Sequence, residues 1–191
     1  MNRNSTCFAG TGNRFPINMK LKNLPDLILL SDFNGNWHSY IEAVYQIFQN
    51  DFFEHKPRFR GTCLRLKRHP VQNGKEYTFY HITHAGHDEH NRVPDLRRCE
   101  RIRWAKPSIE NCDRWRLKVW PQKRRGEDRI CIWLEVENDL DYCVILNWRK
   151  GYLLLWTAFT LEYVHEKKKK LKEYEAWLKT TEGAEQNPTP S

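Results

Sequence analysis

His81 is the side chain best suited to proton transfer, and it follows the aromatic pair Phe79 and Tyr80. An imidazole exchanges protons near neutral pH, as general acid–base catalysis requires. The residue falls in a segment with regular patterning rather than in a loop, which favours a fixed orientation. We therefore expect His81 to be a catalytic acid or base, with a core histidine held by hydrogen bonds as the alternative interpretation.

Two cations are expected to act with this histidine. Lys118 and Arg129 fall on successive predicted strands, and on one face of the sheet if the hairpin pairs them as the alternation of side chains suggests. Two fixed cations there would stabilise the extra negative charge of a pentacovalent phosphorane. The alternative is that each pairs with a carboxylate, Glu135 or Glu110.

A hydroxyl and two indoles extend the predicted site. Thr157 is the lone hydroxyl late in an apolar strand, where it holds a phosphate oxygen in a cleft or a neighbouring group in a buried strand. By alternation, Trp120 shares the face of Lys118 on its predicted strand, and Trp133 shares the face of Arg129 on the next. Because nucleobases stack on such rings, we assign both tryptophans to substrate binding.

An arginine cluster covers residues 92–101, with four arginines around one aspartate and one glutamate. Arg98 and Arg101 are one helical turn apart and suit a phosphate clamp. We expect one or two true phosphate contacts among Arg92, Arg98 and Arg101, and structural salt bridges for the rest. Asp95 follows a proline in the first turn, where capping is its plainest role.

Histidines recur at every third position in His81, His84, His87 and His90. Two or three of them could bind zinc, but the spacing is not that of a known zinc finger, and no helix holds all four on one narrow face. We expect no metal site, although a zinc-stabilised interaction protein remains an alternative.

The chain carries a formal net charge of +8 over 191 residues, and the excess is concentrated. Residues 92–129 contain thirteen Lys and Arg against six Asp and Glu. A concentrated basic segment is typical of phosphate binding, with a solvated surface as the alternative. The interspersed tryptophans favour nucleic acid.

Several chemistries have no counterpart in the sequence. It contains no nucleotide-binding glycine loop, no GxSxG and no carboxylate cluster suited to two divalent metals. Cleavage of phosphodiesters would then proceed without a metal or other cofactor, which favours RNA because its 2′-hydroxyl supplies the nucleophile. No apolar run is long enough for a membrane span, no signal peptide is recognisable, and the six cysteines lack CxxC spacing; these features predict a cytoplasmic protein with reduced thiols.

The elements that position these residues follow from periodicity. We expect a loose arm over residues 1–24, a single domain over 25–179 and a disordered tail over 180–191. Apolar residues at helical spacing predict a helix over 37–52, and prolines predict short helices over 94–101 and 107–111. The segment 75–84 fits a strand or a helix. Four strands joined by short turns are expected, over 115–121, 128–137, 141–149 and 152–160, followed by a helix over 162–179. The predicted class is α+β, with N-terminal helices packed on a four-stranded antiparallel meander and a closing C-terminal helix.

The order of these features resembles the phage- and plasmid-associated nucleases of the barnase–EndoU–colicin–RelE-like (BECR) superfamily. The resemblance covers about residues 31–175 and lies in the order of four motifs. These are His81 after Phe-Tyr, the 92–101 arginines followed by Ile-Arg-Trp, the strands of Lys118 and Arg129, and the closing Trp-Thr-Ala-Phe. It implies helices on a four-stranded antiparallel sheet and a metal-independent endoribonuclease acting as a toxin, with an antitoxin or immunity protein as a partner. It also implies His81 as acid or base, Lys118 or Arg129 as stabiliser of the scissile phosphate, and Thr157 as the hydroxyl of the last strand.

The sequence therefore predicts a toxin-like endoribonuclease that cleaves RNA through a 2′,3′-cyclic phosphate. The alternatives are a non-catalytic nucleic-acid-binding protein of the same fold and the zinc-stabilised interaction protein.

Overall fold

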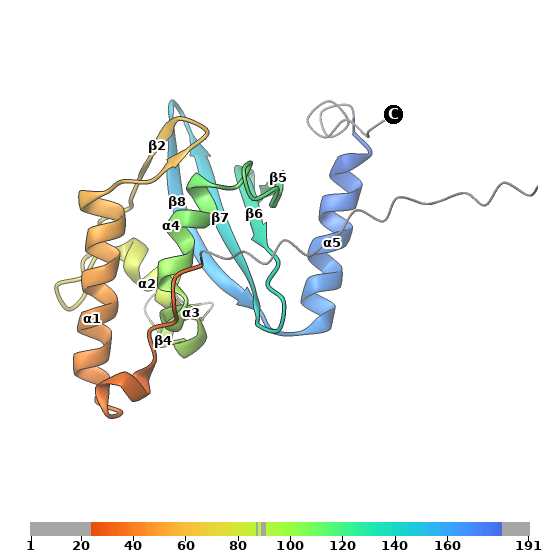
Figure 1. Ribbon diagram of the computed structural model, residues 1–191. Helices are drawn as coiled ribbons and strands as arrows, with labels where there is room; N and C mark the ends of the chain where they lie inside the picture. Colours follow the sequence, from red (N-terminus) through yellow and green to blue (C-terminus); the bar gives the residue numbers. More distant parts are fainter. Residues whose placement is uncertain (1–23, 87, 89–90, 181–191) are drawn as a thin grey trace, which may run out of the picture.

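The computed structural model describes residues 24–86, 88 and 91–180, and it has the α+β class that the sequence predicts (Figure 1). The expected arm and tail lie almost entirely outside this range. The helices are η1 (Leu30–Phe33), α1 (Trp37–Gln49), η2 (Asn50–Glu54), α2 (Tyr77–Thr83), α3 (Leu96–Glu100), α4 (Ile102–Glu110) and α5 (Val164–Leu178). The strands are β1 (Arg58–Phe59), β2 (Thr62–Arg65), β3 (His84–Ala85), β4 (Val93–Pro94), β5 (Lys118–Arg124), β6 (Glu127–Leu134), β7 (Asp141–Arg149) and β8 (Tyr152–Leu161).

The main sheet has six strands in the order β1-β2-β8-β7-β6-β5. Strands β5 to β8 form the predicted antiparallel meander, but the expectation of a four-stranded sheet is wrong. Strand β2 adds to the edge of β8 in parallel, with Leu64 opposite Leu153, and β1 pairs with β2. The sequence indicated an extended segment here but not its pairing, because a parallel partner is reached by a long connection that leaves no local signal.

The main core lies on the face of the sheet that α1 to α4 cover (Figure 1). The predicted apolar stripe of α1 is confirmed, since Tyr40, Val44 and Phe48 are fully buried. They pack with alternate residues of the central strands, including Ile132 on β6 and Val144 on β7.

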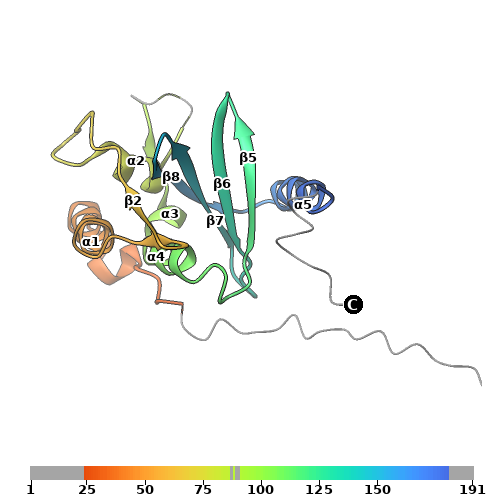
Figure 2. The same ribbon diagram turned by 90° about the horizontal axis from the view of Figure 1, so that it is seen from above.

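A smaller core lies on the opposite face, where α5 packs beside β5 (Figure 2). Its buried members include Trp120, Cys131 and Trp133 from the strands and Trp177 from the helix. The main core therefore lies beneath four helices, α1 to α4, whereas the smaller core lies beneath the single C-terminal helix α5.

The segment 75–84, which fitted a strand or a helix, forms the helix α2, and side chains on both sides of this helix are packed. Phe79 and Ile82 belong to the main core, while Tyr77 and His81 stack on each other one turn apart. The expected start of a helix at Pro107 is wrong, since this proline lies inside α4. Without a backbone N–H, Pro107 leaves one intrahelical hydrogen bond unmade, and α4 ends at Glu110.

In the part of the chain that the structure describes, no helix is both long and apolar enough to cross a membrane.

Candidate active site

Helix α2 fixes the position of His81. The imidazole stacks on the Tyr77 ring with centroids 4.1 Å apart, and is only 4% exposed. A residue and its fourth neighbour face the same side of a helix, which is why these two rings meet. The orientation of His81 is therefore set by the helix.

A β-bulge in β8 brings two consecutive side chains to α2. Ile145 is opposite Thr157, whereas Leu146 is opposite Leu155, so Trp156 is the extra residue. The Trp156 ring lies 5.4 Å from the His81 ring, edge to face, and the Thr157 hydroxyl donates a 2.6 Å hydrogen bond to the His81 carbonyl oxygen. The single hydroxyl proton of Thr157 is therefore used in a hydrogen bond that joins α2 to the sheet.

Arg129 reaches the same indole from β6. Its guanidinium carbon lies 4.8 Å from the Trp156 ring centroid, and its Nη2 donates to Glu127 at 2.7 Å. We call the five residues Tyr77, His81, Arg129, Trp156 and Thr157 the His81 cluster. It joins an imidazole, a hydroxyl and a cation that are far apart in the chain.

Glu127 anchors the cationic side of this cluster. Besides Arg129, it accepts hydrogen bonds from Arg149 at 2.6 Å and from the Asn147 amide at 2.9 Å. The hydrogen bond from Arg129, together with the charge of Arg149, lowers the pKa of the Glu127 carboxyl. This carboxylate pairs with two guanidinium groups, of which Arg129 lies at the Trp156 ring, and offsets part of their charge.

Lys118 lies on the same face of the sheet as Arg129, but apart from the His81 cluster. It is opposite Trp133 on β6, whereas Arg129 lies four residues earlier, about 13 Å along the strand. Its ammonium group is paired with Glu135 and lies 5.0 Å from the Trp133 ring centroid. Pairing with Glu135 was the alternative interpretation for this lysine, and the structure shows it.

The arginine cluster of residues 92–101 is engaged with the protein itself. Arg98 contacts Asp95 at 2.9 Å and donates to the His84 carbonyl oxygen at 3.1 Å. Arg101 is 4% exposed and contacts Glu100 and Asp139. The structure therefore shows structural ion pairs where a phosphate clamp of Arg98 and Arg101 was expected.

Asp95 caps α3, as expected, by accepting a hydrogen bond from the Arg98 backbone. Arg92 lies close enough to His84 for its charge to lower the pKa of that imidazole.

The two tryptophans assigned to base stacking are in the smaller core. Trp120 is 1% and Trp133 is 3% exposed, and the Tyr174 ring from α5 lies 5.6 Å from Trp120. Neither ring is open for stacking in this arrangement, because α5 covers them. The half-buried indole at the cluster is Trp156. Sequence reasoning missed it because strict alternation places the neighbours Trp156 and Thr157 on opposite faces of the strand, and only the bulge puts both on one face.

The histidine series does not form a common site in the described residues. His84 is 7% exposed and contacts the Thr83 hydroxyl at 2.8 Å, while His87 and His90 lie outside the described range. Within residues 24–86, 88 and 91–180, no group of three or more His, Cys, Asp or Glu side chains is arranged to hold a metal ion.

Tyr77, Glu127 and Arg149 are further residues at or beside the cluster that sequence reasoning missed. A helical assignment for 75–84 would have placed Tyr77 over His81, and alternation in β7 would have placed Arg149 on the face of Arg129. Comparison with protein-family models, curated proteins and solved structures found no match to this chain.

Proposed function

We propose that the protein is a metal-independent endoribonuclease. The observation that carries the proposal is the convergence of His81 from α2, Thr157 from β8 and Arg129 from β6 around the Trp156 ring. An imidazole and a guanidinium that contact the same indole can supply proton transfer and phosphate stabilisation together. The indole and the Tyr77 ring add aromatic surface of the kind on which nucleobases stack.

The proposed reaction uses the RNA's own nucleophile. His81 takes the proton of the 2′-hydroxyl, the 2′ oxygen bonds to phosphorus, and the bond from phosphorus to the 5′ oxygen breaks. The leaving 5′ oxygen takes a proton from water, His81 returns its proton to the solvent, and a 2′,3′-cyclic phosphate remains on the other fragment. Arg129 faces the charge that develops on the phosphorane oxygens, while Thr157 is a positioning residue that holds α2 against β8.

A second candidate is a nucleic-acid-binding protein of this fold without catalysis. The observation that favours it is the 4% exposure of the His81 side chain, because a general base must reach the proton that it removes. Catalysis by His81 therefore requires a displacement of the side chains around the ring when RNA binds.

Cleavage of RNA in the presence of EDTA tests the proposal. The wild-type protein should cleave unmodified RNA to 2′,3′-cyclic phosphate ends and leave 2′-deoxy substrate intact. His81→Gln should reduce the rate by about 100-fold or more, the range that general acid–base catalysis contributes. Lys118→Gln is the matched control, because it removes a cation from the same face but outside the His81 cluster, and it should leave the rate near that of the wild type.

Loss of all cleavage in EDTA would remove the metal-independent mechanism. RNA binding without any product, and with no effect of His81→Gln, would favour the second candidate. A toxin role further predicts that induced expression arrests growth and that His81→Gln relieves the arrest.

A further inference from the structure

A small basic cavity lies between η2 and β2, on the side of the molecule away from α5. Its volume is about 270 Å³, and its walls include the buried side chains Phe52 and Leu64. Three cations, Lys56, Arg65 and Arg68, contribute to the lining, and no carboxylate does. An apolar base with a cationic rim suits an anion attached to a flat apolar group.

The three cations differ from those near the His81 cluster in having no acidic counterpart. Arg129 and Arg149 share Glu127, whereas none of Lys56, Arg65 and Arg68 forms a salt bridge with another described residue. Arg65 lies 4.7 Å from the Tyr152 ring centroid, and Arg68 lies 4.9 Å from that of Phe53. Stacking on rings orients a guanidinium and leaves its N–H groups available to an anion.

The chain segment that lines the cavity also contacts the His81 cluster. Lys67 lies between the two lining residues Leu66 and Arg68, and its ammonium nitrogen is 3.5 Å from the Tyr77 ring centroid. The Tyr77 ring in turn stacks on His81. Residues 66–68 therefore connect the cavity, through Lys67, to the Tyr77 ring of the cluster.

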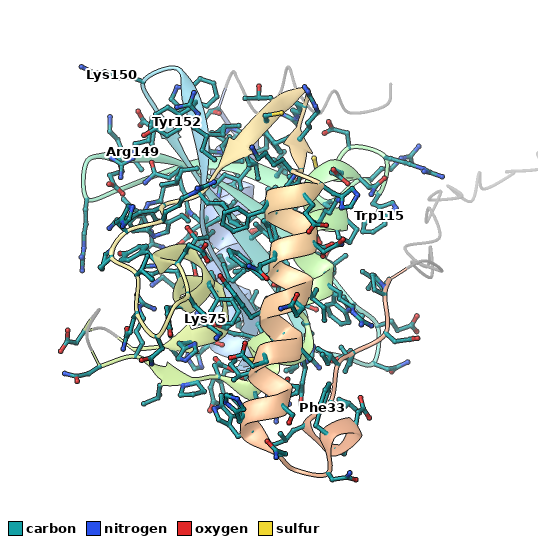
Figure 3. All side chains as sticks on the ribbon, turned by 90° about the vertical axis from the view of Figure 1, so that its left-hand side faces the viewer. Phe33, Lys75, Trp115, Arg149, Lys150 and Tyr152 are labelled. Atoms are coloured by element: carbon teal, nitrogen blue, oxygen red, sulfur yellow. The ribbon has the colours of Figure 1, made fainter. Side chains whose placement is uncertain are left out.

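The same end of the sheet carries further positive charge. Arg149, Lys150 and Tyr152 lie together at the β7–β8 turn (Figure 3), and Arg65 reaches this turn by its contact with Tyr152. A polyanion that occupied the cavity would meet Lys150 at this turn, together with Arg149, whose charge Glu127 partly offsets.

We propose that this cavity binds one phosphate and the attached nucleoside of a single-stranded RNA whose scissile bond lies at the His81 cluster. The volume is below the 300–1,000 Å³ typical of small-molecule sites, so the cavity suits one such unit of a longer strand rather than a whole cofactor. The assignment rests on the proposed function for the identity of the ligand as RNA. The protein would then require that the RNA strand extend from the cleaved bond to the cavity.

Salt-dependent binding of an uncleavable strand tests the assignment. The probe is a short fluorescent 2′-O-methyl oligoribonucleotide, followed by anisotropy over a range of salt concentrations. The pocket variant is Lys56→Gln/Arg65→Gln/Arg68→Gln, and the control is Lys168→Gln/Lys169→Gln/Lys172→Gln on the exposed side of α5, which removes the same charge. Thermal unfolding of both variants verifies that they fold, and Arg65→Lys/Arg68→Lys separates charge from stacking on the rings.

The pocket variant should bind about tenfold more weakly at low salt, as expected for loss of charge-assisted contacts. Its slope of log affinity against log salt should fall in magnitude by about 0.7, the value for one phosphate contact to a single strand. The α5 control should change both quantities far less, and the double lysine variant should keep the wild-type slope.

Equal losses in the two triple variants, or no binding of the strand by the wild type, would overturn the assignment. Binding of uridine monophosphate at the cavity as tight as that of the strand would overturn it too, in favour of a small-molecule site. Cleavage of unmodified RNA is measured separately. If the wild type cleaves RNA but the two triple variants lose affinity equally, only the cavity assignment is wrong. If the pocket variant alone loses affinity but no RNA is cleaved, only the proposed nuclease activity is wrong.

Discussion

The histidines His81 and His84 are three residues apart, and their surroundings give them different chemistry. His81 lies between aromatic rings at the cluster, whereas His84 is held by a hydroxyl. Thr83 donates its one proton to the Phe79 carbonyl oxygen at 2.6 Å, so its 2.8 Å contact with His84 requires Nδ1 of the imidazole to be the donor. The hydrogen bond therefore selects, for the neutral imidazole, the tautomer that carries its proton on Nδ1.

Burial, reinforced by the charges of Arg92 and Arg98, lowers the pKa of His84 to about 4. The folded protein therefore resists protonation of a ring that takes up a proton near pH 6.5 when unfolded. The contribution of His84 to the free energy of unfolding is therefore fully present above about pH 6.5. Up to about 3 kcal/mol of this free energy is lost as the pH falls to about 4. Urea denaturation of the wild type and His84→Gln over this range measures the difference. If the two proteins lose stability in parallel, His84 is not the group responsible.

At the scale of single elements, the four consecutive lysines at positions 167–170 of α5 divide between solvent and the sheet. Lys168 and Lys169 are exposed, but Lys167 contacts Asp141 at 3.1 Å and Lys170 is only 8% exposed. Lys170 donates to Glu173 at 2.9 Å and lies 5.7 Å from the Trp120 ring centroid. The run is therefore a solvated face in part only, and its ends attach α5 to the sheet.

Lys170→Ala should destabilise the protein by about 1–3 kcal/mol, because it removes a buried aliphatic stem and two hydrogen bonds beneath the helix. The neighbouring Lys169→Ala, which changes the charge equally, should stay within about 0.5 kcal/mol of the wild type. Urea denaturation midpoints at constant slope provide the comparison. Equal effects at the two positions would mean that Lys170 does not fasten α5.

At the scale of the whole molecule, Arg101 connects the helical layer to the sheet. It lies between α3 and α4 and donates to Asp139 in the β6–β7 connection at 2.6 Å. The first described residues join the same region, since the Ile28 amide donates to the Glu100 carbonyl oxygen at 3.0 Å. Three separate parts of the chain therefore meet at the neighbouring residues Glu100 and Arg101.

Arg101→Ala should lower the free energy of unfolding by about 3 kcal/mol, because it breaks a buried ion pair and leaves Asp139 without its counterion. The control is Arg97→Ala, whose exposed 3.5 Å pair with Glu162 should contribute less than about 1 kcal/mol. Denaturation and RNA affinity are measured for both variants under conditions where both are folded. A loss of affinity at Arg101 without a loss of stability would restore its role as a phosphate ligand.

The sequence by itself determined the features that depend on local periodicity. Alternation in β5 and β6 placed Lys118 and Arg129 on one face, and helical spacing identified the buried stripe of α1. The α+β class and the antiparallel meander followed from the same patterns. These predictions hold because the period of side chains along a strand or helix is a property of the backbone and needs no knowledge of neighbours.

Only the tertiary structure decided which side chains meet. Alternation cannot show that a bulge turns Trp156 and Thr157 toward α2, that α5 covers Trp120, or that β2 lies parallel to β8. Nor can it show which cations have carboxylate partners, because a salt bridge such as that of Arg101 and Asp139 joins residues 38 positions apart. Burial and pairing depend on the packing of the whole chain, so the candidate site became visible only once the elements were placed in space.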